Sequence, residues 1–223
     1  MARLTTALTY INRLLASKDP DGVLVGKELL KQYRKWRQTL ALSDFYTFFT
    51  SINERYKSVI LRVLRGFPQL IGQFRAFALE EYIRELLVRR VGIPENRMFW
   101  NHDIVIWRSP TYGVKTAKFD LVIGDHYRQR TVPRILVEAK IDVDAQRLRA
   151  AILAFLLARR QYPRASTFLI YIFWNADPTW FEMASTAFDH IFCFHPDQNQ
   201  VSAFLREVKR VVRGAHAPPH RSG

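Results

Sequence analysis

Two short apolar segments that carry three charged residues constrain the fold of this chain more than any other feature. The first, residues 118–123, is interrupted by Asp120, and the second, residues 134–141, carries Glu138 and Lys140 near its end. Both segments are typical of β-strands, and the Gly- and Pro-containing stretch between them suits a hairpin connection. Side chains alternate along a strand, so Glu138 and Lys140 project from the same face. We therefore expect two carboxylates and an ammonium group at the mouth of one hairpin.

Such a group of charges favours a site for a divalent metal. Burying bare carboxylates is costly unless they bind a cation or are well paired. An isolated Asp and Glu-x-Lys pattern is short, and a solvated ion pair at the end of a surface strand is the alternative interpretation. The apolar strands on both sides and the helical sequence before and after them favour the metal site.

The pattern resembles that of the PD-(D/E)XK nuclease superfamily, which has the restriction-endonuclease-like fold. There an aspartate opens one strand and Glu-x-Lys follows on the next; here these are Asp120 and Glu138-Ala139-Lys140, with Phe119 in place of the proline of the name. The resemblance covers about residues 70–195. It implies hydrolysis of DNA phosphodiesters with Mg²⁺, for which Mn²⁺ would substitute. Asp120 and Glu138 would be metal ligands and Lys140 a further catalytic residue.

Members of this superfamily often have a glutamate on the preceding helix, and some have a glutamine on the next one. Glu80 lies three residues from both Phe77 and Ile83, which places it on the apolar stripe of a predicted helix. We therefore assign Glu80, rather than Glu81, as the third carboxylate, which binds the metal directly or through water. Gln146 is a candidate accessory residue, with a plain polar surface position as the alternative.

The order of predicted elements matches the core of the same superfamily. A helix over residues 70–91 precedes three strands, a helix over 144–160 that Asp144 is expected to cap, and an apolar run over 167–174, which is typical of a strand buried on both faces. The expected fold is α/β, an αβββαβ core with a mixed central sheet after an all-α N-terminal segment. The expected parts are a basic helical region at 1–68, a nuclease core at 69–213 and a disordered tail at 214–223.

The net charge of +14 indicates a polyanionic partner, because Lys and Arg side chains neutralise phosphates and release condensed counterions. Residues 1–72 contain 12 Lys and Arg against 5 Asp and Glu, which gives this third of the chain half of the excess charge. The polar faces of its predicted helices carry Lys31, Arg34, Arg55 and Arg62. We assign these four residues as DNA contacts, the alternative being faces that are merely solvated.

Residues 1–66 are predicted to be helical, with a turn at 19–22. A third helix is expected to be capped by Ser43 or Asp44. The aromatic residues that follow, spaced as Phe45, Phe48 and Phe49 are, favour core positions over stacking on DNA bases.

Several partners and locations are not expected. No apolar run approaches the ~18 residues of a membrane span, so no membrane partner is expected. The sequence contains no Gly-rich phosphate loop, so no small-molecule cofactor is expected. The single cysteine, Cys193, fits a reducing compartment, so a cytoplasmic location is expected. In a strand, Cys193 and His195 would share one face while His190 takes the other, which disfavours a zinc site.

Three functions remain open. The first choice is a type II restriction-type endonuclease that cuts duplex DNA as a homodimer. A structure-selective, resolvase-like, viral or mobile-element nuclease would use the same catalytic residues. A non-catalytic basic DNA-binding protein is the third, in which Asp120, Glu138 and Lys140 form structural ion pairs.

Overall fold

The computed structural model describes residues 5–127 and 130–214, so the predicted disordered tail lies, from residue 215 on, outside the described residues. Contacts between residues divide the chain into two units. The helical unit comprises Met1–Leu86 and His195–Asn199, and the sheet unit comprises Leu87–Phe194 and Gln200–Gly223.

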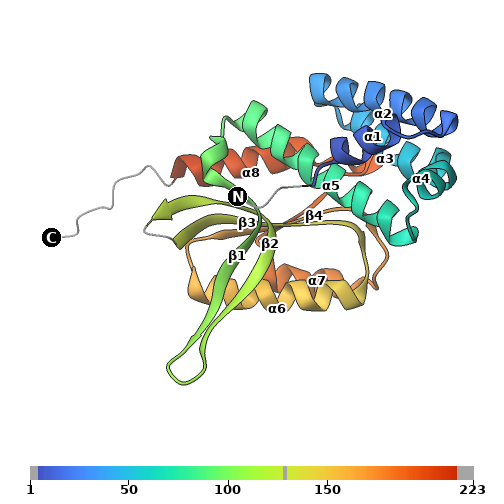
Figure 1. Cartoon of the computed structure of the whole chain (residues 1–223). Helices are drawn as coiled ribbons and strands as arrows, with labels where there is room; N and C mark the ends of the chain where they lie inside the picture. The colour runs from blue at the N-terminus through green and yellow to red at the C-terminus, as the bar shows by residue number, and fades with distance from the viewer. Residues whose placement is uncertain (1–4, 128–129, 215–223) are drawn as a thin grey trace. The chain divides into compact units, whose positions relative to one another are not determined.

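The helical unit is built from the N-terminal helices, as predicted (Figure 1). They are α1 (Ala7–Leu15), α2 (Pro20–Thr39), α3 (Leu42–Thr50), the π-helical turn η1 (Ser51–Arg55), α4 (Lys57–Leu64) and α5 (Pro68–Leu86), with the 3₁₀ turn η4 (Pro196–Gln198).

Two predicted helix boundaries in this unit are corrected. The residues expected to form a turn at 19–22 instead begin α2, because the Asp19 carboxylate accepts hydrogen bonds from the backbone N–H groups of Asp21 and Gly22. Helix α3 begins after Ala41, so neither Ser43 nor Asp44 is its N-cap. The Asp44 carboxylate accepts a hydrogen bond from Thr39 and pairs with a lysine, so its oxygens are engaged elsewhere.

Aromatic side chains form the core of the helical unit, as predicted, and they include residues of α5. The rings of Tyr10 and Phe74 stack at 4.8 Å, and those of Phe45 and Tyr82 stack at 4.3 Å. This packing groups α5 with the N-terminal helices, so the boundary between the units falls after Leu86 and not at the expected residue 68.

The sheet unit has the expected element order and a five-stranded mixed sheet (Figure 1). After α5 come the π-helical turn η2 (Leu87–Val91), the 3₁₀ turn η3 (Glu95–Arg97), β1 (Met98–Ser109), β2 (Gly113–Tyr127), β3 (Arg130–Val143), α6 (Ala145–Gln161), β4 (Ser166–Trp174), α7 (Thr179–Ala187), β5 (His190–Cys193) and α8 (Val201–Gly214). The strands lie in the order β1 to β5; β1, β2 and β3 pair antiparallel, whereas β4 is parallel to both β3 and β5. The predicted αβββαβ order and mixed sheet are confirmed.

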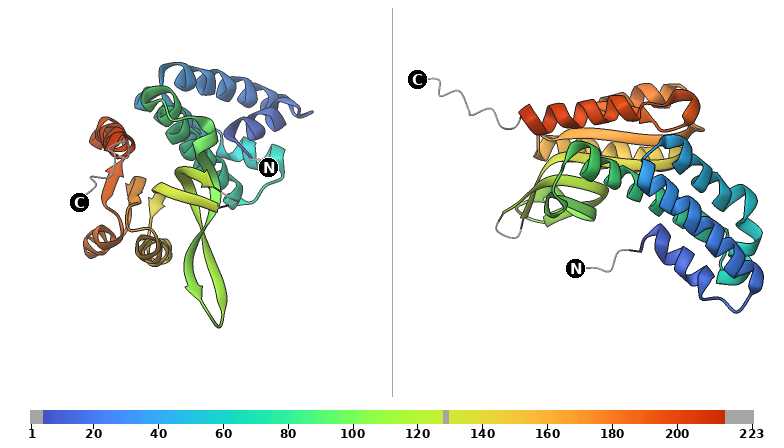
Figure 2. Two further views of the ribbon diagram at one scale, coloured as in Figure 1. Left: turned by 90° about the vertical axis from the view of Figure 1, so that its left-hand side faces the viewer. Right: turned by 90° about the horizontal axis from the view of Figure 1, so that it is seen from above.

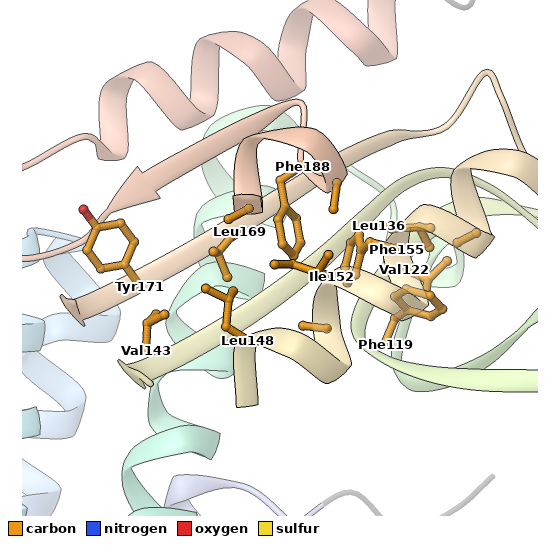
Figure 3. Packing of buried hydrophobic residues seen from close by; sticks show 14 of the residues in the cluster. Phe119, Val122, Leu136, Val143, Leu148, Ile152, Phe155, Leu169, Tyr171 and Phe188 are labelled. Carbon is orange, nitrogen blue, oxygen red and sulfur yellow. The ribbon is translucent and has the colours of Figure 1, made fainter. Parts of the chain in front are cut away.

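Helices cover both faces of the sheet, with α6 and α7 on one face and α8 on the other (Figure 2). The apolar core beneath α6 and α7 joins helix and strand side chains, including Phe119, Leu136, Phe155, Leu169 and Phe188 (Figure 3). As predicted, β4 is almost wholly buried and Asp144 caps α6. The apolar contacts of this core hold β2 and β3 against α6.

The predicted hairpin between β2 and β3 exists, but its strands are longer than expected. Residues 124–127 belong to β2, and Pro133 belongs to β3. The register shifts between Ile123 and Gly124, where a Cβ atom at Gly124 would clash with the carbonyl oxygen of Val132. Glycine here therefore permits a bulge within the ladder rather than the turn that its presence indicated.

Candidate active site

The three charged residues that the sequence singled out lie together where β2 and β3 separate. The ladder between these strands runs to the pair of Leu121 with Val137, and Asp120 and Glu138 come directly after it. From there β3 continues beside β4, where Lys140 pairs with Tyr171. The strand register therefore confirms the expected position of Asp120, Glu138 and Lys140 at the mouth of the hairpin.

One ammonium group lies between the two carboxylates. The Nζ atom of Lys140 is 2.5 Å from Oε1 of Glu138 and 3.7 Å from Oδ2 of Asp120. The same Oδ2 atom accepts a hydrogen bond of 2.8 Å from the backbone N–H of Ala139. Asp120 therefore links β2 to β3 with its side chain just beyond their backbone ladder.

The pKa of Glu138 is shifted far from its ordinary value. Its side chain is 11% exposed, and burial, followed by the nearby charge of Asp120, raises its pKa to about 7. The neighbouring Lys140 lowers the pKa but does not compensate. Near neutral pH the carboxyl group is therefore poised between its two states, and a further cation would favour its ionised form.

An open hollow of about 310 Å³ lies beside these residues on the α6 side of the sheet. It is lined by Lys118, Glu138, Lys140, Arg147, Ala150, Ala151, Ala154 and Phe155. The small alanine side chains of α6 leave room for a ligand, and three cationic groups surround it. The hollow is therefore suited to an anionic group such as a phosphate.

Two residues of this hollow, Lys118 and Arg147, were missed by the sequence analysis. Lys118 lies two residues before Asp120, so the strand alternation used for Glu138 also places it on the face of Asp120. Arg147 lies in the first turn of α6, where its Nε is 3.3 Å from Oδ2 of Asp144. The sequence could have indicated Arg147, because it is spaced by one and two helical turns from the alanine residues that line the hollow with it.

The burial expected for the α5 glutamates is reversed. Glu81 is 5% exposed and Glu80 is only partly buried, although the apolar pattern placed Glu80 inside. The stripe was misplaced because Phe77 is only partly buried, whereas Ala78 and Leu79 are fully so. Glu80 belongs to the helical unit, and its assignment as the third metal ligand stays a prediction.

Glu81 is part of a buried polar network within the helical unit. Its carboxylate accepts hydrogen bonds from the hydroxyl of Tyr33 and from the backbone N–H of Ala7, and Arg37 donates to Glu85 at 2.6 Å. Burial raises the pKa of Glu81 despite these donors. The network joins α1, α2 and α5, so Glu81 has a structural role that its sequence position did not reveal.

Gln146 is exposed in the first turn of α6. Its neighbour Arg147, and not Gln146, is among the residues that line the hollow. An accessory role for Gln146 stays a prediction.

The donor set of the site fits a hard divalent cation. Within residues 5–127 and 130–214, no cluster of three or more His, Cys, Asp or Glu side chains could hold a metal ion. Mg²⁺, however, is commonly held by one or two carboxylates together with waters and substrate phosphates. Asp120 and Glu138 supply two such carboxylates beside a hollow with room for a phosphate.

The four basic residues assigned to DNA contacts differ in their surroundings. Lys31 and Arg34 are exposed on α2 and line an open depression of about 490 Å³ with Lys27, Lys35 and other α2 residues. Arg62 pairs with Asp21 at 2.6 Å and with a second carboxylate, that of Asp19, at 3.2 Å. The guanidinium of Arg55 lies 5.1 Å from the ring centre of Tyr56.

Comparison with models of protein families and with curated proteins finds no match for this sequence. Among solved structures, the native BbvCI A2B2 tetramer is similar, with 14% identity and a TM-score of 0.43 over 96% of this chain and 97% of that one. The restriction endonuclease PspGI in complex with substrate DNA is also similar, with 15% identity and a TM-score of 0.46 over 97% of this chain and 84% of that one.

The element order and the mixed sheet are those of the predicted α/β fold with an αβββαβ core, and Asp120, Glu138 and Lys140 lie together in that core. In the described part of the chain, no helix is both long and apolar enough to cross a membrane.

Proposed function

We propose that this chain is a Mg²⁺-dependent DNA endonuclease, a type II restriction-type enzyme that acts on duplex DNA as a homodimer. The observation that carries the proposal is the pairing of two carboxylates through Lys140 at the edge of a cationic hollow. Mn²⁺ is expected to replace Mg²⁺, since both accept carboxylate and water ligands. The net charge of +14 supports a polyanionic substrate.

We assign each residue of the proposed site a role. When Mg²⁺ is bound, it supplies a Lewis acid for the scissile phosphate and lowers the pKa of a water. Asp120 and Glu138 hold the cation, with Glu80 as a further ligand directly or through water. Lys140 donates to a phosphate oxygen and orients the attacking water, and Lys118 and Arg147 bind the phosphates on either side.

A non-catalytic DNA-binding protein is the second candidate, and one observation favours it. Lys140 contacts both carboxylates, so the three charges are mutually paired without any further ion. A structure-selective or resolvase-like nuclease would share the catalytic residues and differ only in its substrate.

Incubation of the protein with plasmid DNA and Mg²⁺, with the products resolved on a gel, tests the proposal. We expect discrete fragments that carry 5′-phosphate ends, because a restriction-type enzyme cuts at defined sites. The reaction should stop in EDTA and resume when Mn²⁺ is added. Cleavage of branched substrates alone would instead support the resolvase-like function, and DNA that is bound but stays intact would support the non-catalytic one.

The basic depression on α2 leads to a second prediction. Replacing Lys31 and Arg34 with glutamine should flatten the dependence of log K on log salt by about 0.9 for each lost phosphate contact on duplex DNA. The expected change is a uniform loss of affinity across sequences, since phosphate contacts carry no sequence information. Fluorescence anisotropy with labelled duplexes at several salt concentrations measures both quantities.

The matched control is Arg62→Gln. This arginine is exposed and basic, but two carboxylates already hold its guanidinium, so its loss should change the salt dependence less. An unchanged slope in the Lys31 and Arg34 variant would show that the α2 face is only solvated.

A further inference from the structure

The hairpin of β1 and β2 extends past the rest of the sheet as a two-stranded ribbon (Figures 1 and 2). Its outer ladder runs from the pair of Val105 with Thr116 to the pair of Ser109 with Gly113. The register shifts between Val105 and Trp107, which bends the ribbon where it leaves the core. We call residues 107–116 the arm.

The arm exposes large apolar side chains. Tyr112, in the turn, is 84% exposed, Val114 is 51% exposed and Trp107 is 40% exposed. Because Tyr112 and Val114 are mostly exposed, their burial contributes little to the stability of the fold. Exposed side chains of this size at the turn and on both faces of a projecting ribbon are candidates for contact with a partner.

The charge of the arm identifies the class of that partner. Between Ile104 and Phe119 the sequence contains Arg108, Lys115 and Lys118 but no Asp or Glu. Opposite residues of a ladder share a face, so Lys115 lies on the face of Trp107, and Arg108 lies on the other face with Val114. Cations on both faces match a groove with two phosphate walls better than they match a flat anionic surface.

The base of the arm is held firmly by the core. Ile104 is 2% exposed within the core, and Ala117 packs against the same cluster. Arg160 of α6 lies over the ring of Trp107, 5.5 Å from its centre. The arm therefore projects from a fixed base, which limits the conformational entropy that it would lose on binding.

The arm is also continuous with the active site. Strand β2 runs from the turn past Lys115 and Lys118 to Asp120. At about 3.4 Å per residue, Tyr112 lies roughly 27 Å along the strand from Asp120. With one phosphate per 3.4 Å of each DNA strand, this reach corresponds to roughly eight base pairs.

We propose that the arm enters the major groove of duplex DNA next to the scissile phosphodiester, with Arg108 and Lys115 on the two phosphate walls and Tyr112 against the bases. The major groove admits a two-stranded β-ribbon, whereas the minor groove is about half as wide. The proposal rests on the proposed function for the identity of the substrate. It adds a surface that contributes to affinity and to the choice of sequence.

Photo-crosslinking tests the position of the arm. Tyr112 is replaced by p-benzoyl-phenylalanine, and the protein is irradiated with a short labelled random-sequence duplex in EDTA, so that no cleavage occurs. We expect a crosslink that duplex competitor removes and single-stranded competitor leaves. The matched control carries the same photoreactive residue in place of Phe181, an exposed aromatic of α7, and should give no crosslink.

Binding measurements separate the two kinds of contact. Tyr112→Ala should weaken duplex binding about 10-fold without changing the salt slope, because its contact is uncharged, and Tyr112→Phe should restore much of the affinity. Replacing Arg108 and Lys115 with glutamine should lower the slope by about 1.8, from two lost phosphate contacts. All these side chains are exposed, so the melting temperature should not change.

The experiments distinguish an error in the proposal for the arm from an error in the nuclease assignment. If the photoreactive residue in place of Tyr112 crosslinks to DNA and the wild-type protein never cuts DNA, the proposed contact of the arm with DNA is supported and the proposed function is wrong. If the wild type cuts DNA while Tyr112→Ala and the charge variant bind and cut as it does, the proposal for the arm is wrong. A crosslink that single strands compete away equally well also overturns it.

Discussion

Asp120→Asn is expected to reduce DNA cleavage by at least about 10³-fold and to leave the fold intact. Loss of one of the two carboxylate ligands removes several kcal/mol of transition-state stabilisation, and each 1.36 kcal/mol is a factor of ten in rate. The asparagine retains a carbonyl oxygen that can accept the hydrogen bond from the Ala139 N–H group. Apo stability should stay constant or rise, because the charge that repels Glu138 is gone.

Cleavage rates in Mg²⁺ and calorimetric scans of the apo protein measure the two effects. Glu182→Gln is the matched control, since it makes the same chemical change at an exposed site on α7. Asp120→Ala should lose both the activity and the link to Ala139. An Asp120→Asn protein that melts much earlier than the wild type, together with a wild type that never cuts DNA, would assign these residues to a structural network instead.

Lys140→Met is expected to remove most of the cleavage activity, about 10²-fold or more, and to destabilise the apo protein in a pH-dependent way. The pKa of Glu138 is already raised from its unfolded value of 4.5 to about 7, and loss of the ammonium raises it further. The folded state then holds a proton that the unfolded state has released, so stability falls as the pH rises above about 4.5. The wild type loses stability in the same way up to its own Glu138 pKa of about 7, so the variant becomes less stable than the wild type only above that pH. We expect an additional loss of roughly 1 kcal/mol at pH 8 and little at pH 5, because one pH unit corresponds to about 1.36 kcal/mol.

Thermal unfolding across this pH range, with cleavage assays beside it, measures both parts. The double variant with Glu138→Gln removes the buried charge and should recover the stability at pH 8 but not the activity. Mg²⁺ should still raise the melting temperature of the Lys140→Met protein, because lysine is not a ligand. Equal destabilisation at pH 5 and pH 8 would contradict the assignment of the effect to Glu138.

The proximity of Asp120, Glu138 and Lys140 was predicted from strand periodicity. Alternation alone placed Glu138 and Lys140 on one face, and the hairpin brought Asp120 beside them. The buried run of β4 and the capping of α6 by Asp144 likewise followed from local chemistry. Each of these features is determined by a few adjacent residues, so the sequence is sufficient to predict it.

The burial of Glu81, which was not predicted, depends on contacts between distant residues. Glu81 is buried because Tyr33 and Ala7 donate hydrogen bonds to it, and both lie at least 48 positions away in the chain. An apolar stripe cannot reveal such donors, so it favoured Glu80. Asp44 failed as a cap for a more local reason, because Lys35 and Thr39, nine and five residues before it, engage its carboxylate.

The segment His195–Asn199 belongs to the helical unit but follows most of the sheet unit in the sequence. Its position therefore affects when the helical unit can finish folding during synthesis. Within that segment the ring of His195 contacts the hydroxyl of Tyr46 at 2.9 Å. During synthesis, the helices before Leu86 leave the ribosome first, but this partner of Tyr46 follows only after Leu87–Phe194 has been made. At ~5–20 residues per second, the part of α3 around Tyr46 stays uncovered for on the order of ten seconds. The helical unit, whose synthesis begins first, is thus completed only after most of the sheet unit has been translated.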